Sequence, residues 1–309
     1  MQVVFMGKKV KEDLVVVKNS TPFLLVLPAL VVLVGLLGYP MFWSLFYSLF
    51  NYNPIVGRGQ FIGGGNYVWL FTLPRFYNSV QNLAYYLLVG VFAEMVLAIV
   101  IALTIYEFIK SKTLQLILIV ICIIPMMLPP SVVGIIWRFI FSPFGGVINA
   151  FLEGVLGKQP INWLGDKYAL TAILIADIWE WTSLPLMIIY SGRVSLPESV
   201  YEAAKVDGAR PGKVLVRITL PMLRELIAIA FILRFMDSYK FIDKVTVMTA
   251  GGPGGASELP SFLAYLVGVT QFNIGQATAM VWVIALGAVA VITLFIRFMK
   301  NVLAAQKMH

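Results

Sequence analysis

The sequence predicts an all-α integral membrane protein with six transmembrane helices, and three observations support this prediction. Hydrophobic residues make up 60% of the chain and charged residues 12%, whereas soluble domains are about half apolar and a quarter charged. Apolar runs long enough to cross a bilayer recur along the chain. Basic residues gather at the ends of these runs, so the formal charge of +8 reflects membrane topology rather than nucleic-acid binding.

The first apolar run follows a polar N-terminal tail. Residues 1–22 include four lysines, and the run from Phe23 to Tyr47 continues for about 25 residues. A secretory signal peptide has a shorter apolar core, of about 7 to 15 residues. We therefore expect a retained membrane anchor preceded by a cytoplasmic tail at residues 1–22.

Five further apolar runs complete the prediction. The membrane domain is expected to cover residues 23–300, with a cytoplasmic tail at 301–309. Pro125, Pro129 and Pro130 lie within the third run and predict a kink there. The further spans are expected at about residues 80–106, 114–140, 168–190, 223–245 and 276–298.

The distribution of basic residues predicts the orientation of these spans. Of the 23 Lys and Arg residues, 15 lie in the two tails, the link between the second and third spans, and the loop between the fourth and fifth. Seven lie in or beside the other three connections. Because cytoplasmic loops carry an excess of Lys and Arg, both termini are expected in the cytoplasm, and the connections Asn51–Asn78 and Phe141–Lys167 are expected as external loops.

The longest strongly polar interval between spans covers residues 195–221. Ser195 and Glu198 have the spacing of a capping box, which predicts a helix start. An Asp-Gly pair ending at Gly208 predicts the helix end, because glycine adopts the left-handed conformation that a C-cap favours. Pro211 suits the first turn of a second helix. We expect two short helices joined by a bend.

A spaced pattern of residues lies within this loop. Glu202-Ala203-Ala204 is followed after three residues by Gly208 and, further on, by Ile218 and Leu220-Pro221. The pattern resembles the EAA signature of the membrane subunits of ATP-binding-cassette (ABC) importers, in which this cytoplasmic loop forms coupling helices that dock on the ATPase. A generic amphipathic helix pair is the alternative. The resemblance implies these ATPase-coupling residues: Glu202, Ala203, Ala204, Asp207, Gly208, Ile218, Leu220 and Pro221.

Further motifs extend the resemblance over nearly the whole chain. They are Tyr39-Pro40, Gly65-Asn66-Tyr67, Gly146-Val147-Ile148-Asn149, Trp163-Leu164 and Thr249 to Gly254. They are similar to the carbohydrate-uptake type of permease, and within it to the subunit usually encoded first of two. The resemblance implies a type I importer transmembrane domain in a heterodimer with a second permease. It also implies an extracytoplasmic solute-binding protein and two ATPase subunits that bind the ATP and Mg.

One position departs from the family pattern. Just ahead of the polar loop the chain reads Ser191-Gly192-Arg193. Many relatives carry a Gly-Leu pair here, so Arg193 replaces an apolar residue. The substitution adds a charge on the side where the ATPase is expected, and the sequence assigns no role to it.

Ionisable residues inside the expected spans mark a second candidate site. Each costs about 2.5 to 3.5 kcal/mol at the bilayer centre, so each needs a partner or a wet cavity. Asp177 and Trp181 share one face of the fourth span, and Arg234 and Ser238 share one face of the fifth. In the resembled family these helices line the translocation pathway, which implies the following substrate-pathway residues: Asp177, Glu180, Trp181, Leu184, Arg234, Asp237, Ser238 and Phe241.

These side chains suit a carbohydrate, and they also allow other interpretations. Carboxylates and Arg hydrogen-bond hydroxyl groups, and aromatic faces cover the apolar side of a sugar ring. Alternatively, Arg234 and Asp237 neutralise each other, or Asp177 and Glu180 pair with a partner subunit. Glu94 stands alone in the second span, where a subunit-interface role and a pathway role are both open.

Several chemistries are excluded by what the sequence lacks. The only histidine is the last residue, so His-based metal sites and His general bases are nearly excluded. The segment from Gly208 to Lys213 lacks the spacing of a phosphate-binding loop, and no Ser or Thr follows the Lys. We expect no cofactor in this chain and no enzyme activity, with ATP hydrolysis in a separate subunit.

The sequence therefore predicts a permease subunit of the cell membrane that passes a di- or oligosaccharide, such as trehalose or maltose. A polyol or glycerol-phosphate solute is the first alternative. An ion-coupled secondary transporter or a membrane enzyme is more remote, because neither explains the signature in the polar loop.

Overall fold

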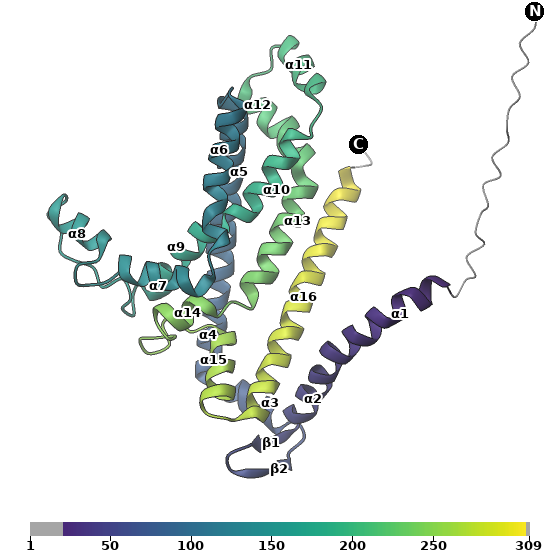
Figure 1. Ribbon diagram of the computed structural model, residues 1–309, viewed down its shortest axis with the longest axis vertical. Helices are drawn as coiled ribbons and strands as arrows, with labels where there is room; N and C mark the ends of the chain where they lie inside the picture. Colours follow the sequence, from purple (N-terminus) through teal and green to yellow (C-terminus); the bar gives the residue numbers. More distant parts are fainter. Residues whose placement is uncertain (1–20, 307–309) are drawn as a thin grey trace, which may run out of the picture. The chain divides into compact units, whose positions relative to one another are not determined.

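The computed structural model describes residues 21–306, so the predicted tail at residues 1–22 lies almost wholly outside the described residues. The chain divides into two compact units, residues 1–46 and residues 47–309. Within the described part, the structure is helical apart from one two-stranded hairpin (Figure 1).

The first unit is an apolar helix. Helix α1 spans Thr21–Leu33, a π-helical turn covers Val34–Gly38, and α2 spans Tyr39–Ser48. Residues Leu24–Ser48 are long and apolar enough to cross a membrane. Its apolar side chains are exposed, with Leu25 77% accessible. A helix that is apolar on all sides is suited to lipid, which agrees with the first expected span.

The second unit opens with the hairpin, in which β1 pairs antiparallel with β2. Short helices then lead into longer ones. The elements up to residue 154 are β1 Phe50–Asn53, β2 Gly57–Phe61, α3 Gly65–Thr72, α4 Pro74–Tyr85, a π-helical turn Tyr86–Val91, α5 Phe92–Phe108, α6 Lys112–Ile123, a 3-10 turn Ile124–Met127, α7 Pro130–Ile140 and α8 Val147–Gly154.

The remainder of the second unit carries most of the candidate residues. Its elements are α9 Ala169–Trp181, α10 Ser183–Val194, α11 Glu198–Val206, α12 Pro211–Val214, a π-helical turn Leu215–Thr219, α13 Leu220–Tyr239, α14 Asp243–Met248, α15 Pro260–Tyr265, a π-helical turn Leu266–Thr270 and α16 Ile274–Gln306.

Four of the described helices could cross a membrane by length and composition, and a fifth crossing arises if the bent pair α6 and α7 counts as one. The four are Leu24–Ser48, Pro74–Phe108, Ala169–Val194 and Ile274–Arg297. Helix α13 is 20 residues long, but its sequence contains four charged residues. The helical membrane fold is confirmed at this coarser level.

The prolines of the third expected span bend it sharply. The helices Lys112–Met127 and Pro130–Ile140 meet at 95°. Proline has no backbone N–H and clashes with the preceding turn, so the helix cannot continue through Leu128-Pro129-Pro130. The predicted kink is confirmed, and the chain turns through a right angle there.

The two segments expected as external loops contain regular structure. Residues 51–78 hold most of the hairpin, α3 and the start of α4, and residues 141–167 hold α8. Asparagines organise both segments. The Asn66 amide donates to the carbonyls of Ser48 and Phe50, each at 2.8 Å.

The second segment is closed by Asn149, which is 2% exposed. Its side-chain oxygen accepts from Ile161 N at 3.0 Å and from Trp163 Nε1 at 3.1 Å, and its amide donates to Ile161 O at 2.9 Å. The turn-rich composition of these segments did not predict these elements, because the side-chain hydrogen bonds that hold them join residues that are not neighbours in the sequence.

The polar loop lies at the end of the second unit that is farther from the hairpin (Figure 1). Its two expected helices are α11 and α12. Gly208 has φ +67°, as predicted for the helix end, and α12 begins at Pro211. The capping box was wrong: α11 starts at Glu198 without a side-chain cap, and the Ser195 hydroxyl donates to Ser191 O at 2.9 Å.

Helices α5, α10 and α13 pack closely through small residues. Ala98 and Ala102 of α5 and Ala230 of α13 are fully buried in one apolar cluster with Leu223. At Gly192 of α10, a Cβ atom would lie 2.9 Å from Leu223 Cδ2 and closer still to Leu226 Cδ1. The absent side chain lets α10 and α13 approach each other.

We predict that Gly192→Val destabilises the protein, because a branched side chain overpacks this contact, typically at a cost of about 1–3 kcal/mol. The midpoint of thermal unfolding in detergent should fall relative to the parent chain. Gly212→Val is the matched control, since a Cβ at Gly212 meets nothing within 4 Å. Equal melting of the two variants would contradict the packing argument.

Candidate functional site

Four helices of the second unit place charged side chains in its interior. Glu94 comes from α5, Asp177 and Glu180 from α9, Arg234 from α13 and Lys244 from α14. Each is at most 1% exposed. We refer to these five residues as the buried ion network.

Arg234 is the centre of the network. Its Nε and Nη2 donate to the two carboxylate oxygens of Glu94 at 2.6 and 2.8 Å, and Nη2 also donates to Asp177 Oδ2 at 2.9 Å. Its Nη1 reaches Asp237 Oδ2 at 3.2 Å. This planar fork matches a carboxylate at two points, which a lysine cannot do.

Lys244 completes the pairing from the other side. Its Nζ donates to Asp177 Oδ1 at 2.6 Å and forms an ion pair with Glu180. Asp177 also accepts a hydrogen bond from the Tyr86 hydroxyl at 2.5 Å. The network thus sets three carboxylates against two cations, and the half-exposed Asp237 adds a further negative charge at its edge.

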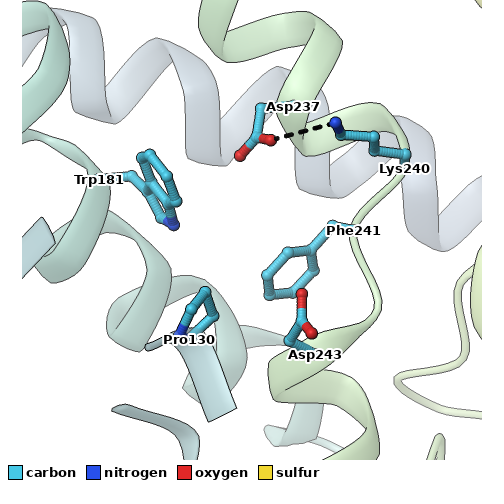
Figure 2. A pocket seen from close by; sticks show the side chains of 6 residues that line it. All are labelled: Pro130, Trp181, Asp237, Lys240, Phe241 and Asp243. Atoms are coloured by element: carbon cyan, nitrogen blue, oxygen red, sulfur yellow. Dashed lines mark ion pairs between the residues drawn. The ribbon is translucent and has the colours of Figure 1, made fainter. Parts of the chain in front are cut away.

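A pocket of about 240 Å³ borders the network. The guanidinium carbon of Arg234 lies 5.0 Å from the centre of the Trp181 ring. Figure 2 shows the rings of Trp181 and Phe241 on opposite sides of the pocket. The lining residues are Pro130, Trp181, Asp237, Lys240, Phe241 and Asp243.

The charged side chains that line this pocket are two carboxylates and one lysine, and the lysine lies near one of the carboxylates. Lys240 Nζ lies 3.8 Å from Asp237 Oδ1, and its side chain is 77% exposed. Asp243 is also exposed. Two carboxylates and one loosely paired cation therefore face the pocket, beside two aromatic rings.

The structure divides the predicted pathway residues into two groups. Trp181, Asp237 and Phe241 line the pocket. Asp177, Glu180, Arg234 and Ser238 are buried and do not line it. Leu184 is half-buried and lies on α10, beyond the helix break at Thr182. Asp177 and Glu180 are paired inside this chain rather than left for a partner subunit.

The structure changes the interpretation of two charged residues, Glu94 and Lys244. Glu94 does not stand alone, because it is fully buried against Arg234 and so has no surface for a subunit interface. Lys244 was missed altogether. Its signal was that the second half of the fifth expected span holds three cations, at residues 234, 240 and 244, while Asp177 and Glu180 in the fourth span had no assigned cation.

The predicted coupling residues are mostly accessible. Glu202, Ala203, Asp207, Gly208 and Pro221 are exposed, and Ile218 and Leu220 are half-buried. Ala204 is only 7% exposed, so it faces this chain and not the surroundings. Among residues 21–306, no group of three or more His, Cys, Asp or Glu side chains is placed to hold a metal ion.

Comparison with known families identifies the chain. Residues 94–307 match the family of binding-protein-dependent transport system inner membrane components. The chain belongs to that family. It is a permease subunit of an ABC transporter, a transport component rather than an enzyme, and the family carries no cofactor of its own.

The permease has curated relatives that match along most of their length. It is 33% identical to the probable ABC transporter permease protein y4oQ of Sinorhizobium fredii, over 89% of this chain and 88% of that protein. It is 31% identical to the trehalose/maltose transport system permease protein MalF of Thermococcus litoralis, over 82% and 84%. It is 27% identical to the sn-glycerol-3-phosphate transport system permease protein UgpA of Pectobacterium atrosepticum, over 91% and 94%.

A solved structure shares the fold of the permease. A chain of the bacterial alginate ABC transporter, crystallised with an alginate pentasaccharide-bound periplasmic protein, superposes with a TM-score of 0.81. The two chains are 20% identical, and the match covers 91% of this chain and 94% of the other. The likeness supports the arrangement of the helices.

We predict that Lys244→Met destabilises the permease by about 3–5 kcal/mol, because removing one partner leaves buried carboxylates uncompensated. Lys240→Met is the control, since Lys240 is exposed and such surface pairs contribute about 0–1 kcal/mol. Unfolding of both variants is followed in detergent. Adding Glu180→Gln to Lys244→Met should recover part of the loss, and no recovery would argue against charge imbalance as the cause.

Proposed function

We propose that the permease forms, with a second permease, the translocation pathway of an ABC importer for a neutral di- or oligosaccharide. A solute-binding protein delivers the sugar from outside, and two ATPase subunits drive transport from inside. The observation that carries this proposal is the position of the pocket. It lies between α9 and α13, and the chain from α9 runs through α10 into the polar loop and back into α13.

Six crossings within residues 23–300 follow if α13 also spans the membrane. Its 20 residues correspond to about 30 Å of helix, which matches the hydrocarbon thickness. The charges in its C-terminal half do not prevent insertion, because Arg234 is paired with Glu94 and Asp177 inside the protein. Together with the four apolar helices and the bent pair, this gives the type I importer arrangement.

The polar loop is proposed to face the cytoplasm, together with both termini. The excess of basic residues in the tails and in this loop supports that orientation. On α11, Glu202 and Ala203 are exposed and present a small, acidic surface to an ATPase groove. Ala204 packs inward, so its contribution to coupling is the fit of α11 against its own chain.

The pocket favours a neutral, hydroxyl-rich solute. Trp181 and Phe241 offer aromatic faces, and Asp237 and Asp243 accept hydrogen bonds from hydroxyl groups. An anionic solute would meet two carboxylates, with one cation that is already near Asp237. We therefore prefer a sugar such as trehalose or maltose to a polyol-phosphate, although one relative is named for sn-glycerol-3-phosphate.

The mechanism is alternating access. Closure of the ATPase dimer on ATP displaces α11 and α12 as a rigid body, and α10 and α13 tilt with them. The pocket between α9 and α13 then opens to the opposite side. A secondary transporter is disfavoured because the buried carboxylates are held by Arg234 and Lys244 instead of facing a wet path.

The proposal predicts that the coupling loop is required for ATPase association. Glu202→Ala removes the exposed acid, and Gly208→Val both adds bulk and strains a left-handed position. Uptake should fall by about tenfold or more, because coupling free energies typically correspond to about 5- to 150-fold. The measurement is co-purification of the ATPase together with uptake that vanadate inhibits.

Ser199→Ala is the matched control for these coupling variants, since Ser199 is exposed on the same helix outside the signature. It should keep both association and uptake. Normal association and uptake in Glu202→Ala and Gly208→Val would reject the coupling assignment. Failure of the parent chain to bring down any ATPase would reject the proposed function itself.

The pocket assignment predicts a change in apparent affinity. Trp181→Leu should raise the Michaelis constant for trehalose or maltose by about three- to tenfold, because an aromatic contact contributes about 0.5–1.5 kcal/mol. Trp179→Leu is the control, since Trp179 is exposed on the same helix and contacts Trp137 outside the pocket. Glycerol phosphate should not compete for uptake. Equal effects of the two tryptophans would remove Trp181 from the solute site.

A further inference from the structure

Arg193 is buried at the junction between the spans and the polar loop. It lies in the last turn of α10 and is 2% exposed, although the loop that follows it is mostly accessible. A buried guanidinium needs compensating partners. The structure supplies them from two other helices.

Two tyrosine rings enclose the guanidinium. Its carbon lies 4.1 Å from the ring centre of Tyr106 on α5 and 3.9 Å from that of Tyr201 on α11. Both distances are well within the range of a cation–π contact. The planar group of Arg193 therefore links one membrane helix to the coupling helix.

Two glutamates complete the enclosure. Arg193 Nε donates to Glu107 Oε1 on α5 at 2.7 Å, and Nη1 lies 3.5 Å from Glu198 Oε1 on α11. The Tyr106 hydroxyl donates to the same Glu198 oxygen at 2.6 Å. This hydrogen bond lowers the pKa of the Glu198 carboxyl, so the glutamate stays ionised at neutral pH and loses its charge only as the pH falls through the lowered value. We call Arg193, Tyr106, Glu107, Glu198 and Tyr201 the arginine clamp.

The clamp holds only the first turns of α11. Among the described residues, Glu202, Lys205 and Asp207 form no side-chain hydrogen bond or ion pair. Tyr201 additionally has its hydroxyl 3.2 Å from Thr219 Oγ1, next to the start of α13. The attachment of α11 to α5, α10 and α13 by polar side chains thus passes through the clamp.

We propose that Arg193 is a positioning residue for energy coupling. By joining α11 to α5 and α10, it makes the coupling helix and the membrane helices move as one body. A displacement of α11 is therefore transmitted to the pocket walls and is not absorbed by bending of the loop. This inference rests on the proposed function. It assigns a role to the one residue that departs from the family pattern ahead of the loop.

Direct contact of Arg193 with a partner is not the basis of this role, because its side chain is enclosed within the permease. A leucine at this position could pack between the tyrosines, but it would remove the guanidinium that pairs with Glu107 and Glu198. Stacking and ion pairing together explain why an arginine fits here.

The test uses the complete transporter in proteoliposomes, with trehalose as the probe solute. Arg193→Leu and Tyr201→Leu are compared with Lys110→Leu, which removes an exposed charge near the same end of α5. Two quantities are measured: the number of trehalose molecules moved per ATP hydrolysed, and hydrogen exchange of the backbone amides of α11. We expect both clamp variants to lower the transport ratio by about tenfold and to speed exchange in α11, with ATPase association and the Michaelis constant unchanged.

A double variant separates the clamp from independent effects. If Arg193 and Tyr201 act as one unit, Arg193→Leu with Tyr201→Leu should lower the ratio no further than the more severe single change. Additive losses, or an equal loss in Lys110→Leu, would overturn the proposal, as would an unchanged ratio in Arg193→Leu. If the parent complex moved no trehalose and bound no ATPase, the proposed function would fail instead, and the exchange measurement would still decide whether the clamp holds α11.

Discussion

The pairing of Arg234 and Lys244 with three buried carboxylates is the interaction on which the rest of the fold depends. An unpaired charge in a membrane interior is expensive, and removing one partner of a buried pair typically costs several kcal/mol. Here Arg234 binds Glu94 and Asp177, and Lys244 binds Asp177 and Glu180. The charges therefore link α5, α9, α13 and α14, and the two-point contact of Arg234 with Glu94 adds geometric specificity to the apolar packing.

The same pairing gives the pocket one fixed wall. Asp237 is held by Arg234, and the Arg234 guanidinium also lies over the Trp181 ring. Tyr86 connects the two regions, because its hydroxyl binds Asp177 and its ring stacks on Phe241 at 5.1 Å. The side chains that line the pocket are thus positioned by residues that do not line it. Preorganisation of this kind limits the entropy that binding must remove.

Sequence reasoning succeeded where a local signal was sufficient. Gly208 and Pro211 mark the bend between α11 and α12 because their backbone preferences act within a few residues. Reasoning failed where a distant partner decides the outcome. The fifth span was expected to continue unbroken to residue 245 and Lys244 was given no role, but the chain leaves α13 after Tyr239 and re-forms a helix at Asp243, where Lys244 is buried. Glu198 likewise matched a local cap, yet Tyr106 and Arg193, about 90 and five residues away, take up its carboxylate.

The closure of residues 142–163 by Asn149 has a practical consequence. One amide joins both ends of this segment, so the intervening stretch, including exposed Gly157 at φ +59°, carries little of the fold's cohesion. Peptide length there can vary at small thermodynamic expense. That stretch is accordingly a suitable place to graft an epitope for antibody fragments, giving a small membrane protein the extra mass and recognisable outline that single-particle imaging requires.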